Sequence, residues 1–386
     1  MTPRRIIVAG AIAHFPLGGG GNTWAFLQYV LGFRALGIET FYVEHLEPKT
    51  AQDDHGRPVA FETSHNARYF GTVMQRFGLE GQAALLQFPG EGHIGLSHAD
   101  VRSLAGDADL FINMSGRFHM TDILSAARRR LYLDLDPGFT QTWQEQYQVD
   151  MNLRGHDSYV TVGLNLGQPD CPLPTGGIRW QTTLPPVVMA EWETAVAPGT
   201  AYTTVADWRG YGAVEWEGVW YGQKAWEFER LMDLPQRVRP PLELCLAIHA
   251  GDEVDREALL RQGWRLSEPR TQVATPDAYR DYLWRSRGEF TPAKHGYVAG
   301  RTGWFSDRSA CYLAAGRPVI LQDTGFGRYL PTGEGLVAFD SLDGAAAAVA
   351  TVEANYAAHA KAARALAAEH LDARRVLPRL LQLAGV

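Results

Sequence analysis

The sequence predicts an α/β protein made of two Rossmann-like domains that face each other across a cleft. A chain of 386 residues is longer than one typical hydrophobic core requires, so two domains are expected. The N-terminal half opens with a strand, a helix and a second strand, and the half that begins near residue 198 repeats this order. A repeated strand–helix–strand pattern predicts parallel sheets covered by helices.

The N-terminal domain, assigned to residues 1–197, begins with a strand over Arg5–Gly10. A glycine-rich turn follows, and Asn22 is the expected N-cap of the first helix. Apolar residues then recur at helical spacing, at Phe26, Val30, Phe33 and Leu36. Further strands are expected at Ile38–Val43, Leu110–Ile112 and Leu131–Leu133, and helices at His65–Phe77 and Asp122–Ala127.

The C-terminal domain, assigned to residues 198–386, starts after a proline-rich stretch that ends near Ala197–Gly199. Its strands are expected at Tyr202–Ala206, Leu242–Ile248, Gly288–Thr291, Val319–Leu321 and Gly335–Phe339. Its helices are expected near Gln223–Met232, Arg256–Gln262, Pro276–Trp284 and Ser306–Ala315. The Ala-rich tail is helical, and its last helix is expected to pack back toward the N-terminal domain.

The net charge and the cysteines limit which partners the protein is expected to bind and in which cellular compartment it is expected to lie. A net charge of −7 disfavours nucleic acids and anionic membranes as partners, because no basic excess is available to neutralise phosphates. No apolar stretch approaches the ~20 residues that a membrane span needs. The three cysteines are far apart and lack zinc-site spacing, so we expect buried free thiols and a cytoplasmic protein.

The most informative segment runs from Gly303 to Gly325. It predicts a polar turn, a helix that Gly316 ends, a buried strand at Val319–Leu321, and a second polar turn at Asp323–Gly325. In open α/β sheets, ligands bind at the carboxyl edge where such turns lie.

With these residues, the second half resembles the nucleotide-binding domain of GT-B glycosyltransferases. Gly303, Trp304 and Ser306 lead into a helix that closes with Ala315-Gly316-Arg317-Pro318-Val319, like the donor-loop segment of that family. Many members carry a glutamate on this helix that holds the ribose, whereas this chain has Cys311. The identity of the nucleotide therefore stays open.

The resemblance implies transfer of a sugar from a nucleoside-diphosphate sugar to a small-molecule or glycan acceptor. The leaving diphosphate needs positive charge or helix-terminal N–H groups. The nucleotide-sugar is a co-substrate, no cofactor is expected, and protein cations are expected to replace a metal. The expected donor-binding residues are Arg209, Lys224, Lys294, His295, Arg301, Ser306, Asp307, Arg308, Ser309, Asp323, Thr324 and Gly325.

An inverting transferase also needs a base that takes the acceptor's proton. His14, directly after the first strand, is the first candidate, and Asp136 and Asp122 are its rivals. Asp134-Leu135-Asp136 matches a metal-binding string, but we interpret it as two acids at a strand end. The loop of Gly18, Gly19, Gly20, Gly21 and Asn22 is expected to let donor or acceptor approach the backbone.

Alternative functions remain compatible with this sequence. A nucleotide-sugar 2-epimerase would share the donor site and need no acceptor cleft. A non-catalytic nucleotide- or glycan-binding protein would keep the fold, and Cys311 favours that option. A dinucleotide-dependent oxidoreductase is disfavoured, because the chain lacks a GxGxxG motif and the acidic residue after the second strand.

Overall fold

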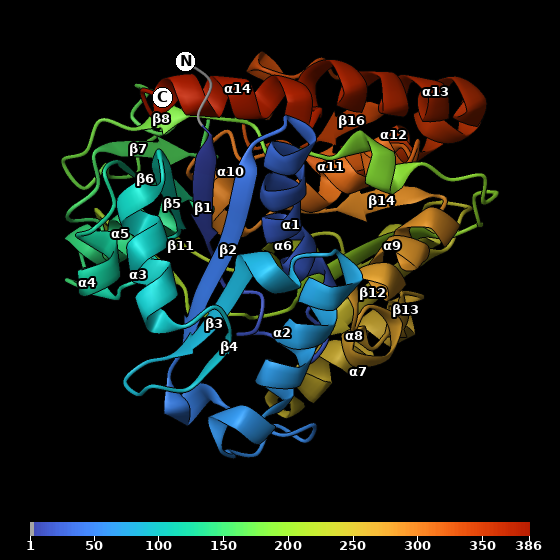
Figure 1. Ribbon diagram of the computed structural model, residues 1–386. Helices are drawn as coiled ribbons and strands as arrows, with labels where there is room; N and C mark the ends of the chain where they lie inside the picture. The colour runs from blue at the N-terminus through green and yellow to red at the C-terminus, as the bar shows by residue number, and fades with distance from the viewer. Residues whose placement is uncertain (1–3) are drawn as a thin grey trace.

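The protein consists of two α/β lobes, seen in a computed structural model that describes residues 4–386 apart from the side chain of Ala250 (Figure 1). The N-terminal lobe holds an eight-stranded sheet in the order β4-β3-β2-β1-β5-β6-β7-β8. The C-terminal lobe holds a six-stranded sheet in the order β13-β12-β9-β14-β15-β16. Apart from the antiparallel edge pair β3–β4, the paired strands of both sheets are parallel. The C-terminal sheet therefore has the doubly wound Rossmann order, and the inner six strands of the N-terminal sheet repeat it.

The strands of the N-terminal sheet are β1 (Arg5–Ala9), β2 (Glu39–Leu46), β3 (Ala83–Gln87), β4 (His93–Gly95), β5 (Leu110–Met114), β6 (Arg130–Asp134), β7 (Ser158–Thr161) and β8 (Gln181–Thr182). Its helices are α1 (Gly20–Ala35), α2 (His65–Arg76), α3 (His98–Asp107), α4 (Thr121–Leu124) and α5 (Phe139–Glu145). The central strands are buried along their length, as strands covered by helices on both faces must be.

The C-terminal lobe contains β9 (Tyr202–Asp207), β12 (Leu242–Ala247), β13 (Arg265–Ser267), β14 (Gly288–Thr291), β15 (Val319–Gln322) and β16 (Leu336–Phe339). A separate antiparallel hairpin joins β10 (Val214–Trp216) to β11 (Val219–Tyr221). The first helices of this lobe are α6 (Lys224–Glu229), α7 (Glu253–Gln262), α8 (Pro269–Gln272) and α9 (Pro276–Arg285). They are followed by α10 (His295–Ala299), α11 (Asp307–Ala314), α12 (Leu342–Ala354), α13 (Tyr356–Leu366), a π-helical segment (Ala367–Leu371) and α14 (Ala373–Leu383).

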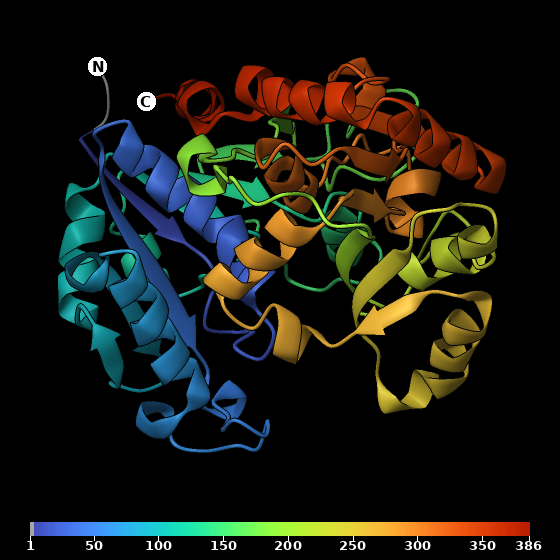
Figure 2. The ribbon, with the colours of Figure 1, turned by 90° about the vertical axis from the view of Figure 1, so that its right-hand side faces the viewer.

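The two lobes share packed contacts along one side of their seam. The helices α13 and α14 run across both lobes, as the red ribbons in Figure 2 show. The last helix, α14, packs against α1 of the N-terminal lobe, and Gly32 allows this because a Cβ there would lie 2.5 Å from Leu377. One buried apolar cluster contains residues of both lobes, including Trp24, Trp192 and Tyr312.

The glycine-rich loop makes contacts that differ from those expected. The first helix begins at Gly20, with Gly19 at the N-cap position, so the prediction that Asn22 caps it is wrong. Instead, the Asn22 amide donates to the carbonyl of Ala11 at 2.8 Å. The Gly20 N–H donates to the Val273 carbonyl of the other lobe at 3.0 Å, which leaves no room for a Cβ.

The same close packing holds for the neighbouring glycines of this loop. A Cβ on Gly19 would lie 1.8 Å from the Phe15 carbonyl oxygen, and one on Gly21 would lie 2.7 Å from the Tyr279 ring. At Gly18, with φ of +85°, the nearest atom would belong to Pro269. Three of these four glycines therefore fit the chain closely against the C-terminal lobe, and we no longer assign the loop to substrate.

Two further expectations concern cysteines and membranes. Cys171, Cys245 and Cys311 are buried free thiols, as predicted. Within residues 4–386, no helix combines the length and the apolar character that crossing a bilayer would demand.

Candidate active site

A pocket of about 480 Å³ lies at the carboxyl edge of the N-terminal sheet. Its walls come from the segments that follow β1, β2, β5 and β6, whose carboxyl ends meet at this edge. The polar residues that line it are His14, His45, Glu47, Ser115, Arg117, His119, Asp136, Thr140, Asp150 and Asn152. Imidazole, guanidinium and carboxylate groups therefore converge on one hollow.

His14 is held in this pocket by Glu44, which lies near the carboxyl end of β2 and is fully buried. The Nδ1 atom of His14 lies 3.1 Å from Glu44 Oε1. The carboxylate also accepts hydrogen bonds from the Tyr42 hydroxyl and from the backbone N–H groups of Ala13 and His14. Donation from Nδ1 to a carboxylate leaves Nε2 as the nitrogen that can take a proton.

A second imidazole pair forms another wall of the pocket. The Nε2 atoms of His45 and His119 lie 3.2 Å apart, so one ring must donate and the other accept. Burial, followed by the neighbouring His119 and His14, lowers the pKa of His45 to about 3. His45 is therefore neutral near pH 7.

Four residues of the site were not predicted from the sequence: Glu44, His45, Arg117 and His119. Glu44 and His45 lie among the last three residues of β2, and Arg117 and His119 follow β5. Polar residues near the carboxyl ends of parallel strands are candidates for a site at that edge, and at β2 and β5 this signal points to all four.

Asp136, a predicted base, joins the two lobes. Its carboxylate accepts from Lys294 Nζ at 3.0 and 3.3 Å, and from the hydroxyls of Tyr211 and Tyr297. All three partners belong to the C-terminal lobe. Because these donors occupy its oxygens, Asp136 is better suited to positioning Lys294 than to taking a proton.

The neighbouring acid, Asp134, has a structural role. It is fully buried and accepts from Thr140, Gln141 and Thr161, and burial raises its pKa. The string Asp134-Leu135-Asp136 therefore stabilises the end of a strand. Among residues 4–386, no three His, Cys, Asp or Glu side chains are grouped so that they could hold a metal ion.

Asp122, the other predicted base, lies outside the pocket. It is about half exposed on α4 and pairs with His98 Nε2 at 2.9 Å. A carboxylate in a surface ion pair has no route to a proton in the pocket, so the structure removes Asp122 from the catalytic candidates.

On the C-terminal lobe, a buried cluster of charges surrounds the end of β14. Lys224 is 7% exposed, and its Nζ donates to Thr291 Oγ1 at 3.1 Å. No carboxylate of the described residues lies within 4.0 Å of that nitrogen. Burial and the nearby Arg308 lower the pKa of Lys224 well below its usual value. Lys224 is therefore a buried amine without a directly paired acid among the described residues.

Arg308 is already engaged by the protein. Its guanidinium donates to Glu289 Oε1 at 2.5 Å, to the Val205 carbonyl at 2.9 Å and to Thr291 at 3.1 Å. Burial is the largest single influence on the pKa of Arg308 and lowers it. The charge of Glu289, together with other nearby groups, outweighs burial, so the pKa is raised overall. The prediction that Arg308 binds phosphate directly is not supported by this geometry, and we assign it to holding Glu289 and the strand ends.

Arg209 is likewise neutralised. It forms ion pairs with Asp255 at 2.7 Å, Asp252 at 3.0 Å and Glu229 at 3.3 Å. Three carboxylates around one guanidinium leave no unmatched positive charge for a diphosphate. The predicted basic pair of Arg209 and Lys224 is thus reduced to Lys224.

The start of α11 contains polar groups without partners. Ser306 occupies the N-cap position but makes no capping hydrogen bond, and its hydroxyl and that of Ser309 are buried and unpaired within the described chain. Asp307 lines an enclosed cavity of about 180 Å³ together with Gln28 and Tyr29 of α1. Burial raises the pKa of Asp307. This cavity lies between the two lobes.

The turn after β15 stabilises itself. Asp323 Oδ1 accepts from the Gly325 N–H at 2.8 Å, and the Thr324 hydroxyl donates to the Trp304 carbonyl at 2.6 Å. Gly325 has a φ of +94°, and a Cβ there would lie 2.5 Å from the Asn165 amide of the other lobe. The predicted sugar-binding residues Asp323, Thr324 and Gly325 thus fix the backbone of the donor loop.

The last two predicted donor residues, Arg301 and His295, are engaged by other groups of the protein. Arg301 is half exposed and pairs with Asp170 at 3.6 Å. His295 Nδ1 accepts from the Gly222 N–H at 3.1 Å and its ring packs on Trp226, while burial lowers the pKa of His295. Neither lines the pocket of about 480 Å³.

Comparison with known proteins places this geometry in a known architecture. No family model matches the chain, and no curated protein matches its sequence. Solved structures do match over the whole chain. HepE from Anabaena, solved with UDP and glucose, has 11% identity and a TM-score of 0.57, over 99% of this chain and 100% of that one.

Two other solved structures are similar in fold. An α-glucosyltransferase, solved with UDP and a 13-mer DNA, has 11% identity and a TM-score of 0.59, over 99% of each chain. The pneumococcal O-GlcNAc transferase GtfA, solved with UDP and GlcNAc, has 8% identity and a TM-score of 0.53, over 100% of this chain and 99% of that one. All three are GT-B glycosyltransferases, and the predicted fold is confirmed: this chain has the GT-B fold.

Proposed function

We propose that the protein transfers a glycosyl group from a nucleoside-diphosphate sugar to a hydroxyl group of a small-molecule or glycan acceptor. One observation carries the proposal: His14, held by buried Glu44, lies in a pocket whose rim residue Asp136 contacts Lys294 of the opposite lobe. The pocket that contains the proposed base is thus linked, through Asp136 on its wall, to a lysine of the opposite lobe.

In this proposal, the N-terminal pocket binds the acceptor and takes the proton from its hydroxyl group. The acceptor hydroxyl would give its proton to Nε2 of His14, while its oxygen bonds to the anomeric carbon and the bond from that carbon to the diphosphate breaks. This direct displacement inverts the configuration at the anomeric carbon. Glu44 stabilises the imidazolium that forms, because its carboxylate already accepts from Nδ1.

The C-terminal lobe supplies positive charge for the leaving diphosphate. Lys224 lacks a carboxylate partner, and a phosphate oxygen would provide the missing anion. Lys294 would exchange its contact with Asp136 for a second phosphate oxygen. Its two distances to that carboxylate, 3.0 and 3.3 Å, are those of a normal ion pair, which a phosphate can replace. In this proposal, protein cations take the place that a metal ion has in other transferases.

The pocket and the comparisons suggest which substrates to test first. HepE and the α-glucosyltransferase were solved with UDP, so UDP-sugars are the first donors to test. The acceptor pocket has Trp143 beside polar groups such as Arg117, Asp150 and Asn152. An aromatic face next to hydrogen-bonding side chains is suited to a sugar ring or another hydroxylated ring.

The test begins with thermal unfolding in the presence of UDP-, dTDP- and GDP-linked sugars. A donor that binds raises Tm by an amount set by its concentration relative to its Kd. Release of the nucleoside diphosphate is then measured with pooled acceptors, and products are identified by mass spectrometry. Isomerised sugar without any acceptor would instead indicate an epimerase.

The decisive variant is His14→Ala. We expect kcat to fall about 100- to 10,000-fold, because a positioned base contributes that much, while the Kd of the donor stays unchanged. His93→Ala is the matched control, since His93 is exposed on the edge strand β4 and lies outside the pocket. Retained turnover in His14→Ala would disprove the assigned base.

A further inference from the structure

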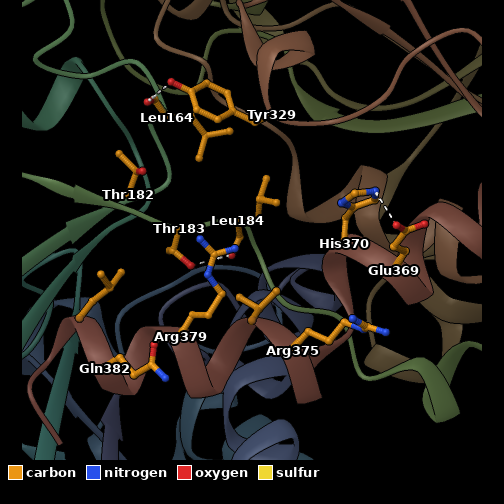
Figure 3. A pocket seen from close by; sticks show the side chains of 12 residues that line it. Leu164, Thr182, Thr183, Leu184, Tyr329, Glu369, His370, Arg375, Arg379 and Gln382 are labelled. Atoms are coloured by element: carbon orange, nitrogen blue, oxygen red, sulfur yellow. Dashed lines mark hydrogen bonds and ion pairs between the residues drawn. The ribbon is translucent and has the colours of Figure 1, made fainter.

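A second cavity, of about 670 Å³, lies at the far end of the seam between the lobes (Figure 3). The N-terminal lobe contributes Leu164 and the segment 182–184, the C-terminal lobe contributes Tyr329, and the rest of the wall is α14 and the π-helical segment before it. It shares no lining residue with the pocket that contains His14. Its volume lies within the range of small-molecule sites, roughly 300–1,000 Å³.

Two arginines give this cavity its charge. Arg375 and Arg379 lie four residues apart on α14, so they occupy one face of the helix. Figure 3 shows the Arg379 side chain rising from α14 toward Thr183 and Leu184, and the Arg375 side chain extending sideways from the same helix. Within the described part of the chain, neither guanidinium has a carboxylate within 4.0 Å. The charges are therefore unneutralised, unlike that of Arg209.

The other lining groups are mostly hydrogen-bond donors or apolar side chains. Thr182 and Gln382 offer a hydroxyl and an amide, and His370 adds an imidazole. The single acid of the wall, Glu369, is largely exposed and lies 3.9 Å from His370 Nε2. Leucine and valine side chains cover the remainder: Leu164, Leu184, Val376 and Leu383.

We propose that this cavity binds a phosphorylated sugar or polyol. Two guanidinium groups one turn apart suit a phosphate dianion, which accepts paired N–H donors. Thr182 and Gln382 would bind hydroxyl groups, and Leu184 and Val376 would contact the carbon face of the ring. The proposal concerns a site separate from the one that binds the transferred sugar, and it stands whether or not the protein is a transferase.

The test is calorimetric titration of the full-length protein with ribose 5-phosphate, ribose and inorganic phosphate. We expect ribose 5-phosphate to bind more tightly than inorganic phosphate, and ribose to give no signal. Arg375→Ala with Arg379→Ala should weaken ribose 5-phosphate binding about tenfold or more, because charge-assisted contacts to the phosphate are lost. Both side chains are exposed, so the double variant should fold, and Thr182→Val provides an independent variant with a smaller effect.

Two controls separate this site from general charge and from the proposed active site. Arg256→Ala with Arg261→Ala removes the same charge from α7, where both arginines are exposed, and should leave binding unchanged. His14→Ala should also leave it unchanged. The proposal is overturned if ribose 5-phosphate gives no signal at about 10 mM, if the α14 double variant binds like the wild type, or if His14→Ala abolishes binding.

Discussion

The carboxyl edges of the two sheets carry similar residue types, but their charged side chains differ in whether other protein groups already pair with them. On the N-terminal edge, polar side chains surround an open pocket, and His14 is oriented by a single buried carboxylate. On the C-terminal edge, most of the cations are matched by acids of the same protein, as at Arg209 and Arg308. The residue type alone therefore does not say whether a charge is available to a ligand.

The two edges also differ in what the charges stabilise. The Glu44 carboxylate holds one catalytic candidate and three backbone or hydroxyl donors, so it serves the pocket directly. The Arg308–Glu289 pair instead joins the ends of β9 and β14 to α11. Lys224 on that edge is buried and has no carboxylate partner among the residues that the structure describes. Mutation of a paired structural charge such as Arg308 should therefore lower stability. Mutation of a residue proposed to bind substrate, such as Lys224, should lower ligand binding without lowering stability.

The largest expected effect on stability comes from Arg308→Ala. Removing the guanidinium leaves Glu289 fully buried without its cation, and breaking a buried ion pair costs about 3–5 kcal/mol. We expect a corresponding fall in the free energy of unfolding, measured by urea denaturation, together with loss of activity. A protein of wild-type stability would mean that Arg308 is free for a ligand after all.

A matched pair of variants sharpens this result. Arg301→Ala removes an exposed arginine of the same lobe and should change stability by less than about 1 kcal/mol. The double change Arg308→Met with Glu289→Leu removes both buried charges and should recover much of the loss.

A smaller effect, of the opposite sign, is expected for Lys224→Met. Methionine keeps the length of the side chain while removing an amine whose pKa burial has already lowered, so Tm should stay the same or rise. Donor binding should weaken about 10- to 100-fold, because a charge-assisted contact to phosphate is lost. Calorimetry with the donor and thermal unfolding measure the two quantities separately.

The control for this variant is Lys49→Met, since Lys49 is exposed and pairs only with Glu47 at the surface. It should alter neither donor binding nor Tm. If Lys224→Met lowers Tm and leaves donor binding intact, Lys224 belongs with the structural charges of this edge.

Much of the fold could be predicted because it depends on local patterns. Strands rich in apolar residues, such as β1 and β12, were predicted within a residue of their observed bounds. β3 and the helix α3 were not predicted. β3 has the sequence Ala-Ala-Leu-Leu-Gln, which favours a helix as much as a strand, and it becomes a strand only by pairing with β2.

The candidate site was predictable only in part, because partners far apart in the sequence decide what a side chain can do. The position of His14 after β1 was enough to place it in the pocket. The pairing of Asp136 with Lys294 joins residues on different lobes, and Asp323 is engaged by its own turn. No spacing rule in the sequence reveals that these side chains are already hydrogen-bonded, since those contacts depend on how the chain folds and how the two lobes meet.

The last expected effect appears only at low pH: it concerns the pH dependence of stability and tests the N-terminal edge. The pKa of His45 is lowered to about 3 in the folded protein, mainly by burial, whereas the unfolded chain has the ordinary value near 6.5. Between these values the unfolded state binds more protons, so stability falls as the pH drops below about 6.5, at roughly 1.4 kcal/mol per pH unit from this residue. His45→Gln should reduce that slope in urea denaturation between pH 4 and 7, while His93→Gln, at an exposed position, should leave it unchanged. An unaltered slope in His45→Gln would mean that folding does not lower the pKa of His45. The ring would then gain its proton near pH 6.5 and, below that pH, place a positive charge beside His14 that weakens it as a base.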